Sequence, residues 1–217
     1  MALQFHHLFN CCQLLNYMLT IKETKEIPEQ HYLLLANLLN TAWKDLILTT
    51  PEHIKSRFAS GNKFLAVYGK PNMMGEEHLT KIYGNIPLEE NLPLGLLETI
   101  ALRTLGNMDL VPKNYKELTN DGFWKNPVEK ADTLIMVDVT KIPFGPKEVP
   151  ELLMTSIKNF LQQSSFEYAW TYTPNIKNIK QWHETFGAID SHYILPYARP
   201  GWKEPAVNFM DYSRLIK

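Results

Sequence analysis

The stretch "ADTLIMVDV" (residues 131–139) constrains the fold most, because its apolar residues follow one another almost without interruption. Such a run is typical of a central strand that is covered on both faces. The loop "TKIPFGPKE" leads into "VPELLMTSIKNFLQQ", whose apolar residues keep helical spacing, and "FEYAWTYT" (residues 166–173) predicts a further strand. A strand, helix, strand unit of about 40 residues is normally parallel, with a right-handed crossover. We therefore expect a parallel strand pair here.

Two helices and two strands are predicted ahead of this unit. Apolar residues at three- and four-residue steps predict a helix that begins near Pro28. A second helix would be capped by Thr50, begin at Pro51 and end at Gly61. The remaining predictions in this part are strands at 63–69 ("KFLAVYG") and 93–104 ("PLGLLETIALRT") and irregular connections at 70–91 and 106–130.

A further helix and two strands are predicted after the strand, helix, strand unit. In "TPNIKNIKQWHETFGA", Thr173 suits a helix cap, Pro174 the first helical position and Gly187 the left-handed position after the end. Two strands, "HYILPY" and "AVNFMDY", are then predicted on either side of a turn at "RPGW". The order of elements predicts an α/β (α+β) fold, in which helices pack on a mixed sheet.

The chain is long enough to bury a substantial core. Its 217 residues, 45% of them apolar, suffice for one large globular domain or two small ones. We expect residues 1–27 to form an N-terminal helical extension and residues 28–217 to form a single domain. No stretch approaches the roughly 20 apolar residues that a membrane-spanning helix needs.

Charge and cysteine content narrow the class of protein. Lys and Arg number 22 against 23 Asp and Glu, so no long-range field would attract nucleic acid or an acidic membrane. The two cysteines, Cys11 and Cys12, are adjacent and therefore poorly placed to cross-link one another. We expect a protein of the reducing cytoplasm, with no nucleic-acid or membrane partner.

The loop at residues 140–147 is a candidate phosphate site. It precedes a predicted helix, whose N-terminus presents free backbone N–H groups and a partial positive charge. Lys141 and Lys147 could add charge, but Gly145 is the loop's one glycine and Pro146 has no N–H to donate. The same residues equally suit an ordinary connection between a strand and a helix.

His183 is the most unusual residue of the predicted helix after the second strand. It shares an apolar stripe with Ile179 and Phe186, so the pattern permits either a hydrogen-bonded structural histidine or a catalytic one. Trp182 suits the core or a pocket wall. Thr171 would project from the end of the preceding strand, where an α/β sheet usually keeps its site.

Arg199, in the turn "YARPGW", could clamp a carboxylate or phosphate, or could bond turn carbonyls in solvent. His6 and His7 have no metal-ligand spacing with the cysteines, so no metal site is expected. The sequence contains neither a Gly-x-Ser-x-Gly motif nor a Walker lysine loop.

The sequence resembles the GNAT acyltransferase superfamily over roughly residues 28–212. The similarity lies in "TLIMVDV" leading into a loop and helix, and in "YAWTYTPNIKNIKQWHETFGA", where "WHETFGA" matches the family's aromatic-Tyr-x-x-x-Gly-aromatic run and Asn175 lies near its asparagine. The resemblance implies a mostly antiparallel sheet with one splayed parallel strand pair that binds acyl-coenzyme A. It also implies that His183 occupies the position of the tyrosine that protonates the leaving thiolate.

Within the superfamily, the chain resembles the GNAT-like domains of polyketide synthase loading modules and their stand-alone relatives. The similar stretches include "GNKFLAVY", "PLGLLETIAL", "YKELTNDGFWKNP" and "WHETFGAIDSHYILPYARPGW". This resemblance implies an acyl pocket lined by Thr171, for which Thr173 competes, and by His183, Trp43 and Arg199, with Trp182 beside them. The residues that it implies for cofactor binding are Val137, Val139, Phe144, Gly145, Lys147, Glu148 and Asn175.

The implied function is acyl transfer from an acetyl- or malonyl-type CoA thioester to a small amine or a carrier-protein thiol. His183 would serve as general acid or hydrogen-bond donor and Thr171 as a second donor. Asp138 or Glu98 could take the acceptor's proton through water. However, "FGPKEV" departs from the family's Arg/Gln-x-x-Gly-x-Gly/Ala phosphate loop. A binding protein of this fold without turnover, or an enzyme similar to malonyl-CoA decarboxylases, are therefore the alternatives.

Overall fold

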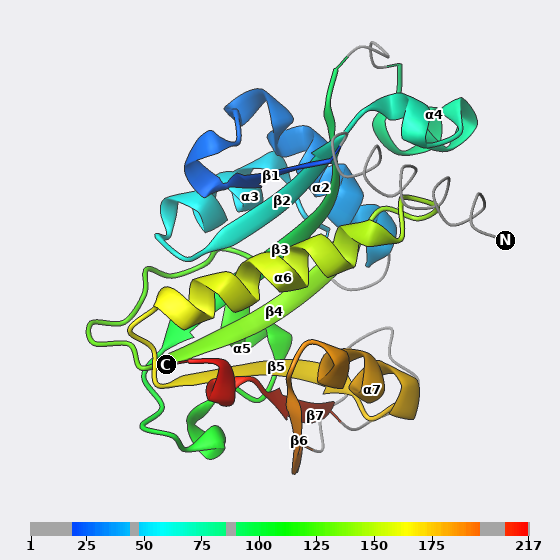
Figure 1. Cartoon of the computed structure of the whole chain (residues 1–217). Coiled ribbons are helices and arrows are strands. Elements are labelled where there is room, and N and C mark those ends of the chain that lie inside the picture. The colour runs from blue at the N-terminus through cyan, green and yellow to red at the C-terminus, as the bar shows by residue number, and fades with distance from the viewer. Residues whose placement is uncertain (1–18, 44–47, 86–89, 196–206, 217) are drawn as a thin grey trace, which may run out of the picture.

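A computed structural model describes residues 19–43, 48–85, 90–195 and 207–216, which form a seven-stranded sheet with helices on both faces (Figure 1). The strands lie side by side in the order β1-β2-β3-β4-β5-β7-β6. They are β1 (Thr20–Glu23), β2 (Phe64–Gly69), β3 (Leu92–Leu102), β4 (Thr133–Lys141), β5 (Tyr168–Pro174), β6 (Ile189–Leu195) and β7 (Val207–Asp211). The α-helices are α2 (Tyr32–Ala42), α3 (Pro51–Ala59), α4 (Glu76–Tyr83), α5 (Tyr115–Thr119), α6 (Glu148–Gln163) and α7 (Lys177–Thr185).

Strands β4 and β5 form the one parallel pair among the described strands. They pair only from Thr133 to Met136 on β4 and from Tyr168 to Thr171 on β5. Beyond this point β4 continues alongside β3 to Lys141, whereas β5 continues alongside β7. The two strands therefore diverge after Met136 and Thr171. The predicted fold class, a mostly antiparallel sheet with a splayed parallel pair, is confirmed.

A β-bulge lies beside the point of divergence. Asp138 pairs with Glu98 of β3, whereas Met136 pairs with the next residue, Thr99, so Val137 is the extra residue on β4. A bulge bends its strand and redirects the side chains and backbone groups around it, and bulges are over-represented next to active sites.

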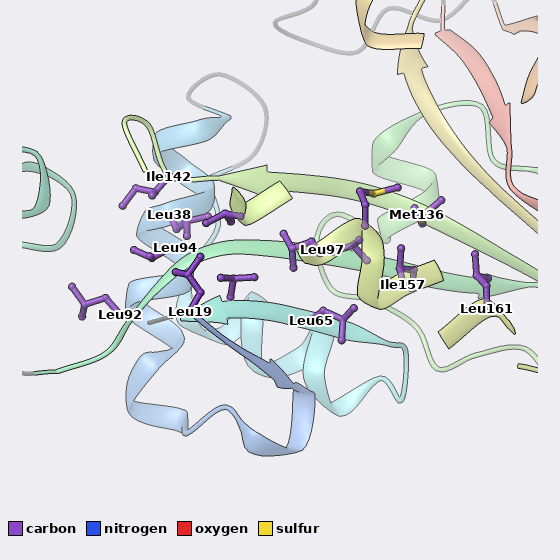
Figure 2. Close-up of a cluster of buried hydrophobic side chains, with 14 of the residues drawn as sticks. Leu19, Leu38, Leu65, Leu92, Leu94, Leu97, Met136, Ile142, Ile157 and Leu161 are labelled. Carbon is purple, nitrogen blue, oxygen red and sulfur yellow. The ribbon is translucent and has the colours of Figure 1, made fainter. Parts of the chain in front are cut away.

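Alternate residues of β2 enter different clusters, as the period of a strand requires. Leu65 and Val67 join the cluster that includes Ile157 of α6, part of which is drawn in Figure 2. Ala66 and Tyr68 join the cluster that includes Leu35 of α2. Figure 1 shows the corresponding layers, with α6 in front of β2 to β4 and α2 and α3 behind them. The sheet is therefore buried on both faces.

Local sequence signals set the ends of α3. The side chain of Thr50 accepts a hydrogen bond from the backbone N–H of His53, and Pro51 takes the first turn, where its missing N–H costs nothing. Gly61, with φ of +78°, follows the end of the helix. The predicted cap, start and terminal glycine of this helix are confirmed.

Helix α7 begins later than its sequence predicts. Thr173 and Pro174 were the expected cap and first residue, but both belong to β5, where they pair with Asn208 and Val207 of β7. Ile176 is the actual cap residue. Pairing with β7 therefore overrides a capping pattern that would be sufficient in isolation. Gly187, with φ of +97°, does follow the helix end as predicted.

Several short elements lie where the sequence predicts none. Thr20–Glu23, inside the expected helical extension, form β1 at the edge of the sheet. Helices α4 and α5 lie within the predicted irregular connections, and β6 begins three residues earlier than expected. Strand β1 and helices α4 and α5 are too short to give a clear periodic signal. Residues 1–18 lie outside the described residues.

Candidate active site

A side-chain hydrogen bond connects β4 and β5 at the point where the two strands begin to diverge. The Thr171 hydroxyl donates a hydrogen bond to the backbone carbonyl of Met136, 2.8 Å away, and only 4% of Thr171 is exposed. The hydroxyl proton therefore joins the two strands at their last paired position. Thr173, the competing threonine, is fully buried two residues farther along β5.

Helix α7 packs against β5 and β6, and His183 lies on the buried side of this helix. His183 is the one buried residue within α7, with 6% exposure, and its Nδ1 lies 2.7 Å from the hydroxyl oxygen of Tyr212. The Trp182 ring meets the imidazole edge to face at 4.9 Å. Burial lowers the pKa of His183 to about 4, so the imidazole is neutral at pH 7.

Because His183 is neutral in the folded protein, the free energy of unfolding should depend on pH. Its folded pKa of about 4 lies below the ordinary value of 6.5, so between these values the unfolded chain binds a proton that the folded protein does not. The contribution of His183 to the free energy of unfolding should therefore fall by about 3 kcal/mol as the pH drops from about 6.5 to 4, and should stay constant below that. Urea unfolding at neutral and acidic pH measures this loss. The loss should be smaller in His183→Gln, where the contributions of His31 and His53, whose pKa values are also lowered by burial, remain. An identical pH dependence in the two proteins would contradict the assignment.

Trp43 contacts β4 on the face of the sheet that α2 and α3 cover. Its indole N–H donates to the hydroxyl oxygen of Thr140 at 2.7 Å, and its ring packs against the cluster of α2 and α3. Trp182, in contrast, packs against the cluster on the α6 side. The structure thus places Trp182 and His183 in contact on the α6 side of the sheet and Trp43 on the opposite face, whereas the Thr171 hydroxyl is engaged between the two strands. Arg199 lies outside the described residues.

A buried ionic network adjoins the bulge on the α3 side. Arg57 of α3 and Glu98 of β3 form an ion pair of 2.9 Å, with side chains 1% and 0% exposed. Asp138, 4% exposed, accepts a hydrogen bond from the Tyr115 hydroxyl at 3.3 Å. Both candidate bases, Glu98 and Asp138, therefore lie in the interior next to the extra residue of β4. Arg57 and Tyr115 are missed by the sequence analysis, although an arginine between Ile54 and Phe58 on an otherwise apolar helix face is a visible signal.

The loop from β4 to α6 is held by its own contacts. The Gly145 N–H donates to the carbonyl of Ile142, and the Lys141 ammonium donates to the Gly145 carbonyl at 3.0 Å. A Cβ at Gly145 would lie 2.4 Å from the Ile142 side chain, so the turn itself requires this glycine. Two expected phosphate ligands, the lysine and the glycine, are therefore engaged in building the loop.

The N-terminus of α6 departs from a typical phosphate cradle. Glu148 and Glu151 place two carboxylates in the first turn, where they compete with an anion for the helix dipole. Pro146 and Pro150 contribute no N–H groups. Lys147 caps the helix without a side-chain hydrogen bond.

The remaining predicted cofactor residues have different surroundings. Phe144, in the left-handed region with φ of +61°, is 73% exposed and stacks on His78 of α4 at 4.3 Å. The Val137 side chain belongs to the core cluster with Phe64, so only its backbone could meet a ligand. Val139 and Asn175 are half-buried.

No protein-family model matches the chain, and no curated protein matches it by sequence. Among the described helices, none is both long enough and apolar enough to cross a membrane. Solved structures do match. The loading GNATL domain of CurA from Lyngbya majuscula is 14% identical, covers 89% of this chain and 96% of its own, and has a TM-score of 0.59.

Two further structures show the same arrangement at similar identity. A putative acetyltransferase from Salmonella typhimurium, solved with its cofactor acetyl-CoA, is 10% identical over 89% of this chain and 92% of its own, with a TM-score of 0.55. Aminoglycoside 6'-acetyltransferase type Ii is 11% identical over 91% of this chain and 98% of its own, with a TM-score of 0.52. The chain has the GNAT N-acyltransferase fold.

Proposed function

We propose that the chain is an acyl-CoA-dependent acyltransferase, which acts on an acetyl- or malonyl-type thioester. The observation that carries the proposal is the divergence of β4 and β5 beside the bulge at Val137, with the buried imidazole of His183 on the adjoining helix. One similar structure holds acetyl-CoA as its cofactor. The acceptor in this proposal is a small amine or a carrier-protein thiol.

In the proposed reaction the acceptor attacks the thioester carbonyl carbon, and negative charge develops on the carbonyl oxygen. Neutral His183 would donate a hydrogen bond to this oxygen from its buried position on α7. Thr171 could join it only by rotating its hydroxyl away from the carbonyl of Met136. The bond from the acyl carbon to sulfur then breaks, the new acyl bond forms, and the departing thiolate takes a proton from solvent.

The acceptor's proton needs a base on the other side of the reacting centre. Glu98 is engaged with Arg57, whereas Asp138 shares its carboxylate with the hydroxyl of Tyr115. Asp138 is therefore the better placed of the two to accept the proton, through a water molecule. Arg199 would hold the distal carboxylate of a malonyl group, and Trp43 would form the pocket wall on the α2 side.

A binding protein of the same fold without turnover is the second candidate. It is favoured by the two carboxylates and two prolines at the start of α6, which weaken the expected attraction for a pyrophosphate. Both candidates bind a ligand, so the measurement that separates them must report binding and turnover independently.

Thermal unfolding with CoA, acetyl-CoA and malonyl-CoA tests the proposal. We expect at least one acyl-CoA to raise the melting temperature at millimolar concentration, because a ligand that binds the folded protein alone stabilises it by mass action. Release of free thiol, with a panel of amines, or of carbon dioxide from malonyl-CoA then reports turnover. Carbon dioxide without acyl transfer would identify a decarboxylating enzyme.

The acidic start of α6 offers a matched variant for this experiment. In Glu148→Gln/Glu151→Gln the two negative charges are removed, so CoA should bind roughly 2- to 10-fold more tightly if its phosphates lie at this helix end. The Glu184→Gln variant, on the exposed side of α7, serves as the control for a change in net charge. If no acyl-CoA stabilises the wild type or the double variant, the proposed function is wrong.

A further inference from the structure

Tyr212 is held in a fixed position next to His183. It follows β7 directly, its backbone N–H donates to the Ala169 carbonyl of β5 at 2.7 Å, and only 1% of it is exposed. Figure 1 shows β7 alongside β5, with α7 nearby. The Tyr212 ring lies edge to face with the imidazole at a centroid distance of 6.0 Å. The backbone hydrogen bond to the sheet and the burial of the ring therefore hold the Tyr212 hydroxyl in place.

Among the residues that the structure describes, the hydroxyl proton of Tyr212 has two possible acceptors. These are Nδ1 of His183 at 2.7 Å and the backbone carbonyl of His183 at 3.5 Å. The carbonyl already accepts hydrogen bonds from the N–H groups of Phe186 at 3.1 Å and Ala188 at 3.2 Å. A carbonyl oxygen has two lone pairs, and both are used by these donors. The Tyr212 proton therefore points at Nδ1.

This assignment fixes the proton on the imidazole. A neutral imidazole has one N–H, so when Nδ1 accepts a hydrogen bond the proton must be on Nε2. Burial raises the pKa of Tyr212 far above its ordinary value, so the hydroxyl keeps its proton. Among the described residues, no hydrogen-bond partner is recorded for Nε2 of His183, which leaves this N–H for a ligand.

We propose that Tyr212 is a positioning residue that holds His183 as the neutral tautomer with its proton on Nε2. His183 is then a fixed hydrogen-bond donor to the oxygen of the acyl thioester, and not an acid that gives up a proton near neutral pH. The part of the proposal that concerns the thioester rests on the proposed function, whereas the tautomer does not.

The charged groups around α7 do not alter this arrangement. On α7 itself, Lys180 is paired with Asp190 of β6 at 2.8 Å, and Glu184 is exposed. Arg214, in the short helix after Tyr212, donates to the carbonyl of Gly187. On β7, Asp211 accepts from the N–H of Ser213. The pKa of His183 is lowered by burial.

Nitrogen NMR of the histidine side chains in the intact protein tests the tautomer directly. At neutral pH we expect the His183 spectrum to show an unprotonated Nδ1 and a protonated Nε2. In Tyr212→Phe we expect the signals to move toward a mixture of the two tautomers, because Nδ1 has lost its donor. A wild-type spectrum with the proton on Nδ1 would overturn the proposal, whatever the activity and whether or not the variant folds.

Kinetics test the consequence of the tautomer. Tyr212→Phe should lower kcat by about tenfold and leave the KM for acyl-CoA unchanged, since one hydrogen bond that orients the donor is lost. In the His183→Gln background, where the side-chain amide supplies the donor, the same Tyr212→Phe change should have little effect. Tyr83→Phe removes another buried tyrosine bond, to the Pro93 carbonyl at 2.5 Å, and should leave kcat unchanged.

The two proposals fail in different ways. If acyl-CoA neither binds nor reacts but the proton is found on Nε2, the proposed function is wrong and the tautomer stands. If acyl-CoA reacts and Tyr212→Phe has the same kcat as the wild type, Tyr212 has no positioning role.

Discussion

Arg57→Met is expected to lower the free energy of unfolding by about 3–5 kcal/mol, because it leaves the carboxylate of Glu98 buried without its countercharge. Both side chains of the ion pair are almost fully buried, and the Arg57 Nε–H also donates to the carbonyl of Gly122. Methionine retains much of the side-chain volume, so the loss reports the charge rather than a cavity. Urea unfolding followed by circular dichroism measures the difference.

A second ion pair on nearby elements provides the control. Lys55 and Glu29 are also 2.9 Å apart, but their side chains are 66% and 70% exposed, so Lys55→Met should change the free energy of unfolding far less than Arg57→Met does. The double variant Arg57→Met/Glu98→Leu should recover part of the stability, because the Glu98 carboxylate is removed together with its countercharge. A loss below about 1 kcal/mol in Arg57→Met would show that Glu98 is neutral or paired differently.

His183→Ala is expected to lower kcat for release of thiol from the acyl-CoA that binds by about 10²- to 10³-fold, with little change in KM. The reason is that a hydrogen bond to the carbonyl oxygen strengthens as charge develops there, so its loss affects the transition state more than the bound substrate. Thiol release at saturating acyl-CoA measures the change, and thermal unfolding confirms that the variant is folded.

Two further variants serve as comparisons for His183→Ala. His183→Gln should retain part of the activity, since its amide can donate from near the position of Nε2. His192→Asn changes a histidine that is 88% exposed and lies in the left-handed region, which asparagine also tolerates, so the rate should not change. Equal rates in His183→Ala and the wild type would remove His183 from the mechanism.

The fold could be predicted where local sequence determines local structure. The apolar run of β4 fixes a strand buried on both faces, and the Thr50 and Pro51 pair fixes the start of α3. The same logic fails at Thr173 and Pro174, which have the composition of a helix start but pair with β7. The partner strand lies more than 30 residues away in the sequence, so no local pattern could show it. Strand β1, with four residues and the sequence "TIKE", gives no periodic signal at all.

The candidate site also contains some residues that the sequence could reveal and others that it could not. His183 and Trp182 could be found because they interrupt or continue an apolar stripe on a helix. Tyr212 could not be found as their neighbour, because its contact with His183 depends on how β7 returns beside β5. Nor could the sequence reveal that Lys141 and Gly145 hold their own loop together, since this depends on the turn that Gly145 makes with Ile142.

The short parallel pairing also has a mechanical consequence. The sheet consists of two antiparallel halves, β1 to β4 and β5 to β7, which are joined by four residue pairs between β4 and β5. A ligand that bound between the diverging ends would lie next to this joint. The hydrogen bond from Thr171 to Met136 belongs to the last of these pairs, so it would be the contact between the two halves nearest to that ligand. Amide hydrogen exchange at these four pairs is therefore the place to observe how a ligand opens or tightens the two halves.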